Sequence, residues 1–359
     1  MINVTKPYLP DEAKYNSYVS HIFKSKWLTN NGELLQELER RLAKYLDVEN
    51  VLLVNNGTLA LNVAYKLLEL SGEVITTPFS FVATTSSLVW GGLKPVFADI
   101  DKNTLNIDTG EIEKKITKST SAIVPVHVFG NGCNVEEIEK LAKSYALKVI
   151  YDAAHAFGVS YEGRSILNYG DISTLSFHAT KVFHTIEGGA LIINNKKLYD
   201  KARKVIDFGI DGPDHISYLG INAKMNEFQA AMGLCILDDI EKIQSSRQKI
   251  YNRYVDAFRL EARIILQSHN NKCSYNYSYF PIILEDEESM LKVRELLRRE
   301  DIMPRRYFYP SLDQLNYIDS EFMPVSNSIS SRILCLPMYD SLEVNDQKRI
   351  IQTVKEALL

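Results

Sequence analysis

The stretch NVLLVNNGTLALNVAYKLLEL, residues 50–70, contains a complete passage from a strand into a helix. Its first part is a short Val/Leu run without charge, which is typical of a strand covered on both faces. Its second part, residues 58–70, places small and leucine side chains on one helical face. Asn56, Gly57 and Thr58 lie between the two parts. The order predicts a buried strand that enters a helix through a glycine turn.

Further apolar runs alternate with helical segments downstream of this unit. Strands are expected in GEVITTP (72–78), KPVFADI (94–100), SAIVPVHV (121–128), LKVIYDAA (147–154), STLSF (173–177) and ALIIN (190–194). Helices are expected in FVATTSSLVWGG (81–92), which would end at Gly91 or Gly92, and in VEEIEKLAKSYA (135–146). This alternation, from about residue 50 to 195, predicts an α/β fold with a mostly parallel sheet covered on both faces.

The flanking segments differ from this central block. An amphipathic helix is expected before it, at ELLQELERRLAKYL (33–46), and one long helical segment after it, at FQAAMGLCILDDIEKIQSSRQKIYNRYVDAF (228–258). From about residue 261 a strand, YNYSYFPIIL (275–284), is followed by helices at 287–300 and 345–358. The C-terminal part is therefore expected to be a compact α+β unit.

Composition narrows the class of protein. The 359 residues are 45% hydrophobic and 24% charged, with a net charge of −4. This balance argues against a nucleic-acid or membrane partner, and no apolar stretch reaches the length of a membrane span. The polar start lacks the apolar core of a signal peptide. Because the four cysteines are scattered, we expect free thiols, no metal site and a cytoplasmic location.

The residues after the first strand could bind a phosphate. Gly57 allows close backbone approach, the helix N-terminus offers unpaired N–H groups, and Thr58 adds a hydroxyl. An ordinary strand-to-helix turn with a threonine cap has the same sequence. Both interpretations remain open for this segment alone.

Asp152 and Lys181 are the other two candidates. Asp152 follows an apolar strand and could bind a cation or a metal, or merely cap the next segment. Lys181 lies among Phe177, Val182 and Phe183. It could be a solvated surface charge, but a partly desolvated lysine is a nucleophile for carbonyls. A phosphate cradle, a strand-end acid and a nucleophilic lysine together are what pyridoxal 5′-phosphate (PLP) requires.

At this point the sequence resembles the DegT/DnrJ family of PLP-dependent sugar aminotransferases. The matching motifs appear in order: NNGTLAL (55–61), TPFSFVAT (77–84), VIYDAAHAFG (149–158), SFHATKVFHTIEGG (176–189) and GINAKMNEFQAA (220–231). The resemblance implies the aspartate-aminotransferase type of fold, fold type I. A large domain over residues 1–240, with an N-terminal arm, would hold a mainly parallel seven-stranded sheet. A small α+β domain would cover residues 241–359.

The resemblance also implies roles for the cofactor site. Lys181 would form the Schiff base with PLP and move the proton, and Asp152 would contact the pyridinium nitrogen. His155 would lie near the phenolic oxygen, and Phe81 would stack on the ring. Phosphate contacts would come from Gly57, Thr58 and Ser176, and from Asn222 of the other subunit in a homodimer with shared active sites. Lys224 stands where many relatives have arginine.

The expected reaction moves an amino group from L-glutamate to a nucleotide-linked keto-sugar. The segments VTKPYLP (4–10), WLTNNG (27–32) and RYFYP (306–310) resemble members that aminate dTDP-4-keto-6-deoxyglucose at C4, for surface glycan synthesis. Candidate substrate residues are Lys6, Trp27, Thr29, His184, Tyr309, Arg305 and Arg306. His184 could equally be a buried structural histidine, and the three cations could be plain surface charges.

Several alternatives remain open. Amination at C3 of a 3-keto sugar or at C4 of a UDP-linked sugar fits the same motifs. A sugar dehydratase of this fold would have histidine in place of Lys181. A regulatory protein would not need Lys181 and Asp152. A nucleotide-binding oxidoreductase would be expected to carry GxGxxG after the first strand, which is absent.

Overall fold

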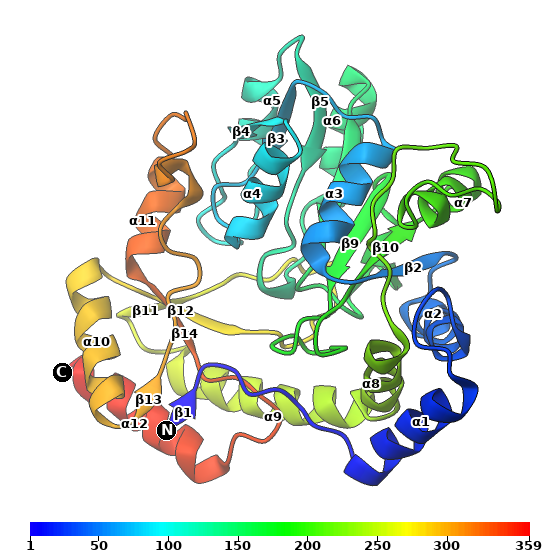
Figure 1. The fold of residues 1–359 in the computed structure, drawn as a ribbon. Helices are drawn as coiled ribbons and strands as arrows, with labels where there is room; N and C mark the ends of the chain where they lie inside the picture. Colours follow the sequence, from blue (N-terminus) through cyan, green and yellow to red (C-terminus); the bar gives the residue numbers. More distant parts are fainter.

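A seven-stranded sheet forms the centre of the computed structural model, which describes all 359 residues (Figure 1). Its strands, in spatial order, are β2 (Val51–Val54), β10 (Gly189–Ile193), β9 (Ile172–Ser176), β6 (Lys148–Asp152), β5 (Thr120–Val124), β3 (Glu73–Thr76) and β4 (Lys94–Phe97). Strand β10 runs antiparallel to both of its neighbours, and the other paired strands are parallel. This is the mainly parallel seven-stranded sheet expected of fold type I, so the predicted fold class is confirmed.

Alternate side chains of the strands enter two different cores. In β2, Val51 and Leu53 pack with the core that includes α2 (Glu33–Leu46) and α8 (Glu227–Asp238). Leu52 and Val54 pack with a second core, which includes α3 (Gly57–Leu67). Both faces of the sheet are therefore covered by helices, as the uncharged Val/Leu runs predicted.

Other elements complete the central part. They are the helices α1 (Glu12–Ser25), α4 (Val82–Trp90), α5 (Thr109–Lys115), α6 (Val135–Tyr145) and α7 (Lys196–Val205), the 3₁₀ turns η1 (Val128–Gly130) and η2 (Ile166–Asn168), and the hairpin β7 (Ser160–Tyr161) and β8 (Arg164–Ser165). Helix α4 ends at Trp90 with Gly91 at its C-cap, as expected.

The C-terminal part has a sheet of its own. Its elements are β11 (Ile264–Leu266), β12 (Phe280–Leu284) and β14 (Ile333–Leu336), the helices α10 (Glu287–Arg299), α11 (Pro324–Arg332) and α12 (Val344–Ala357), β13 (Ile302–Met303) and η3 (Leu312–Gln314). Strand β1 (Ile2–Asn3) pairs with β13, so both chain ends lie beside this part (Figure 1).

The segment expected as one long helix is divided into two. Helix α8 ends at Asp238 and α9 (Ile240–Phe258) begins two residues later, because Asp239 leaves the helical conformation with φ −101° and ψ 2°. The apolar face of α9 also changes partners. Ile240 and Ile243 pack in the central core, and Ile250 and Tyr254 pack in the C-terminal core.

Helix α9 thus belongs to both cores, and Ile2 joins the C-terminal one. The division into domains 1–240 and 241–359 stays a proposal, which limited proteolysis would test. None of the helices is long and apolar enough to cross a membrane.

Candidate active site

The turn from β2 into α3 forms a small cradle. The Asn56 side chain accepts a hydrogen bond from Leu59 N at 2.9 Å and so caps the helix. The N–H groups of Gly57 and Thr58, in the first turn, have no acceptor within the helix. A Cβ on Gly57 would lie 2.9 Å from Ser176 Cβ at the end of β9, so only glycine fits. Free N–H groups, two hydroxyls and a positive helix terminus suit a phosphate group.

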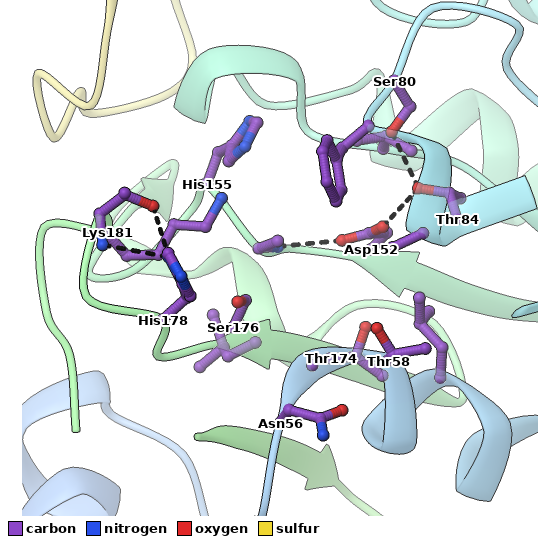
Figure 2. Close-up of a pocket in the computed structure, with 18 of the residues that line it drawn as sticks. Asn56, Thr58, Ser80, Thr84, Asp152, His155, Thr174, Ser176, His178 and Lys181 are labelled. Atoms are coloured by element: carbon purple, nitrogen blue, oxygen red, sulfur yellow. Dashed lines mark hydrogen bonds between the residues drawn. The ribbon is translucent and has the colours of Figure 1, made fainter. Parts of the chain in front are cut away.

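Asp152 lies at the carboxyl end of β6, near the centre of the same pocket (Figure 2). Its Oδ2 accepts a hydrogen bond from Thr84 Oγ1 at 2.7 Å, and its Oδ1 accepts one from Ala154 N at 3.1 Å. Burial raises the pKa of the carboxyl, while the Thr84 hydrogen bond and the charge of Lys181 act in the opposite direction. The carboxylate is thus buried, oriented and aimed at an enclosed space.

Lys181 lies in the loop between β9 and β10, on the side of the pocket opposite Ser80 and Thr84 (Figure 2). Burial lowers the pKa of its amine to about 8, although Asp152 opposes the shift. Its Nζ lies 6.0 Å from the centre of the Tyr279 ring. An amine with a lowered pKa loses its proton more readily than a surface lysine, which favours attack on a carbonyl carbon.

Two ring side chains line the pocket beside these groups. Phe81, the N-cap residue of α4, is about half exposed and lines the pocket, where its ring can stack on a flat ligand. His155 is buried beside Phe129 and Phe308, whose rings lie nearly parallel to the imidazole. Its Nδ1 accepts a hydrogen bond from Phe129 N, so the proton of the neutral ring is on Nε2. Because burial holds its pKa well below the usual value, His155 is neutral at physiological pH.

Several pocket residues did not emerge from the sequence. Ser80 and Thr84 lie within the motif at residues 77–84, but the sequence does not show that Thr84 bonds to Asp152 and Ser80 to Thr84. Tyr279, Tyr307 and Phe308 come from the C-terminal part and reach the pocket through tertiary contacts, which no spacing along the chain reveals. Arg305, a substrate candidate from the sequence, lines the pocket beside them.

The comparison with known families decides the classification. The model of the DegT/DnrJ/EryC1/StrS aminotransferase family matches residues 10–355. The chain belongs to this family. Aminotransferases of the DegT family use PLP, and the phosphate cradle, the buried acid and the lysine described above fit that cofactor.

Individual relatives agree with this classification. The dTDP-4-amino-4,6-dideoxy-D-glucose transaminase of Shigella dysenteriae is 43% identical over 99% of this chain and 98% of its own. The enzyme of the same name from Escherichia coli is 42% identical over 95% of this chain and 94% of its own. The crystal structure of DesI in the presence of its TDP-sugar product superposes with a TM-score of 0.93, at 31% identity, and covers 99% of this chain and 92% of DesI. This DegT-family chain is therefore a PLP-dependent nucleotide-sugar aminotransferase.

Some expected residues of this aminotransferase do not line the pocket. Lys6, Trp27, Thr29, Tyr309 and Asn222 are exposed outside it. His184 is buried, and its two ring nitrogens bond to Tyr8 O and Ile186 N. The structure places His184 in a structural setting, which was the second of the two interpretations given for it.

The two neighbouring arginines have different surroundings. Arg306 is nearly buried, donates hydrogen bonds to Glu287 and to Ser331 O, and stacks on Tyr309. Arg305 lines the pocket, with its guanidinium 4.6 Å from the centre of the Tyr307 ring and no acidic partner. Lys224 bonds to Asp207 instead of facing the pocket. Arg305 is thus the one arginine available to a ligand in this pocket.

Proposed function

We propose that this aminotransferase moves an amino group from L-glutamate to C4 of dTDP-4-keto-6-deoxyglucose, which gives dTDP-4-amino-4,6-dideoxyglucose for surface glycan synthesis. The observation that carries the sugar assignment is the 43% identity over nearly the full length with a transaminase named for that product. The pocket supports the chemistry, because it joins a phosphate cradle, a buried acid and an amine of lowered pKa.

The residues have distinct proposed roles in this reaction. Bound PLP supplies an aldehyde that accepts the amino group and an electron-withdrawing ring that acidifies the neighbouring carbon. Lys181 Nζ would hold the cofactor covalently and, once released, would move a proton between the substrate carbon and the cofactor. The Asp152 carboxylate keeps a proton on the pyridine nitrogen. Phe81 and His155 orient the ring, and Gly57, Thr58 and Ser176 hold the phosphate.

Arg305 is the proposed anchor for the negatively charged part of a substrate. Its guanidinium is unpaired and rests on Tyr307, and the backbone on both sides of its Cα is fixed by hydrogen bonds between Arg305 and Cys335. A guanidinium binds phosphate or carboxylate oxygens in two-pronged fashion. We expect Arg305→Gln to raise KM for the keto-sugar nucleotide or for the amino donor, and assays with each substrate limiting would distinguish the two.

A homodimer with shared sites completes the proposal. Asn222 is exposed and lies outside the pocket of its own chain. The neighbouring surface carries large exposed apolar side chains: Trp90, Ile216, Tyr218, Leu219 and Ile221. Apolar surface of this kind is typical of a protein interface. A second copy that covers it would bring Asn222 toward the phosphate of the other subunit's cofactor.

A substrate panel tests the proposed reaction. The enzyme would be incubated with PLP, L-glutamate or another amino acid, and dTDP- or UDP-linked 3-keto and 4-keto sugars. We expect 2-oxoglutarate to accumulate and NMR to place the new nitrogen at C4 of the dTDP sugar. Nitrogen at C3, or a preference for a UDP sugar, would contradict the assignment while leaving the aminotransferase class intact.

A further inference from the structure

Three buried side chains form a hydrogen-bonded row at one wall of the pocket (Figure 2). Thr84 Oγ1 lies 2.7 Å from Asp152 Oδ2, and Ser80 Oγ lies 2.8 Å from Thr84 Oγ1. Ser80 and Thr84 come from the segment in which the chain enters α4, and Asp152 comes from the end of β6. The row therefore joins two elements that are far apart in the sequence.

The chemistry of the groups fixes the direction of these hydrogen bonds. An ionised carboxylate can only accept, so the single hydroxyl proton of Thr84 points to Asp152. Thr84 Oγ1 must then accept from Ser80. The second carboxylate oxygen, Oδ1, accepts from Ala154 N. Each oxygen of Asp152 thus has one donor, and the plane of the carboxylate is held from both sides.

We propose that Ser80 and Thr84 are positioning residues that keep Asp152 ionised and oriented toward the pyridine nitrogen of bound PLP. The inference rests on the proposed role of Asp152 and adds the two hydroxyls behind it. Neither hydroxyl needs to touch the cofactor for this role, because both act through the carboxylate.

The electrostatic surroundings show why the carboxylate needs such support. Burial favours its neutral form, and among the groups that oppose burial the Thr84 hydrogen bond is the largest influence on its pKa, ahead of Ala154 N and Lys181. Burial raises the pKa of the Tyr65 phenol on α3, and the nearby charge of Asp152 raises it further, so Tyr65 stays neutral. Loss of the Thr84 hydroxyl would move Asp152 toward the neutral acid, which no longer stabilises a protonated pyridine nitrogen.

The chain offers a matched control for this test. Thr85 is the next residue of the same helix, and its hydroxyl is buried without any hydrogen-bond partner. Thr84→Val and Thr85→Val therefore make the same change at adjacent buried positions, and only the first breaks the row. Thr84→Ser keeps the hydroxyl and serves as the rescue variant.

The experiment measures two properties of the holoenzymes: retention of PLP, and the pH midpoint of its visible absorption band. We expect Thr84→Val to weaken PLP binding roughly ten- to hundredfold, the range for a hydrogen bond to a charged group, and to shift the midpoint. Ser80→Ala, which removes only the outer donor, is expected to shift both in the same direction by a smaller factor. Thr84→Ser and Thr85→Val are expected to match the unaltered protein.

Normal retention and an unchanged midpoint in Thr84→Val would overturn the proposal, as would an equal loss in Thr85→Val. Asp152→Asn separates the proposed role of Asp152 from the proposed role of the Ser80 and Thr84 hydroxyls. If Asp152→Asn retains PLP normally, the proposed role of Asp152 is wrong. If it releases PLP while Thr84→Val does not, only the positioning role of the hydroxyls is wrong.

Discussion

The amine of Lys181 and the carboxylate of Asp152 line one pocket, and burial acts on both in the same sense. It favours the neutral form of each group, while their mutual attraction favours the charged forms. For Lys181 burial prevails, and the pKa falls to about 8. The free enzyme therefore has a substantial fraction of neutral amine near physiological pH, ready to react with an aldehyde.

A pH dependence of cofactor capture follows from this shift. The rate at which the apo-protein takes up PLP should rise about tenfold per pH unit below pH 8 and level off above it, because only the neutral amine reacts. Absorbance after rapid mixing measures this rate. An exposed lysine in a peptide would continue to gain rate up to its pKa near 10.4. If the rate of PLP uptake by the protein levelled off only near pH 10.4, the proposed effect of burial on Lys181 would be contradicted.

Four secondary-structure elements form the pocket around these groups: the ends of β2, β6 and β9 and the N-terminus of α3. These three strands run in the same direction, so their carboxyl ends meet at one edge of the sheet. Helix α3 and β9 approach so closely at Gly57 that a methyl group would contact Ser176. The cradle depends on the absence of a side chain at that position.

Gly57→Ala tests this contact. We expect the variant to bind PLP about tenfold or more weakly, because the added Cβ must displace Ser176 or the backbone that holds it. Gly110→Ala is the control, since Gly110 also lies in the first turn of a helix and its added Cβ would meet only the capping Asp108. Equilibrium titration with PLP gives both affinities. Equal affinities for the two variants would show that the cradle tolerates a side chain.

The elements differ in how far the sequence predicted them. The strands of the central sheet and helices α3, α4 and α6 were predicted, because buried parallel strands leave apolar Val/Leu/Ile runs between helical segments. Helix α5 and the hairpin of β7 and β8 were not predicted. The break at Asp239 did not emerge, because neither glycine nor proline marks it and apolar residues continue on both sides. Thr84 belongs to the motif at residues 77–84, but its contact with Asp152 could not be predicted, because it depends on how α4 packs against β6.

In the whole molecule, the pocket lies between the central sheet and the C-terminal part, and both contribute residues to it. Tyr279 and Arg305 come from that part, and the segment of Tyr279 is fixed by Asn276 and Ser278, which donate hydrogen bonds to His155 O. The sequence indicated the C-terminal unit and Arg305 as a substrate candidate from it, but not the contribution of Tyr279 to the pocket. A second copy of the chain is proposed to complete the site through Asn222, which lies outside its own pocket.

Subunit mixing tests the shared site. Lys181→Ala and Asn222→Asp are each expected to be inactive, the second because it opposes the phosphate with a negative charge. In a mixed dimer with shared sites, one site has both residues intact, so random mixing should restore about a quarter of the activity. Sites built from a single chain would leave the mixture inactive, which would contradict the proposal. Light scattering of the mixture would verify that dimers form.

The central claim is that Lys181 carries the cofactor, and borohydride reduction tests it most directly. Reduction of the PLP-loaded protein, followed by proteolysis and mass spectrometry, should place one pyridoxyl group on the peptide that contains Lys181, and none in Lys181→Ala. A modified lysine elsewhere, or a Lys181→Ala protein with full turnover, would contradict the account.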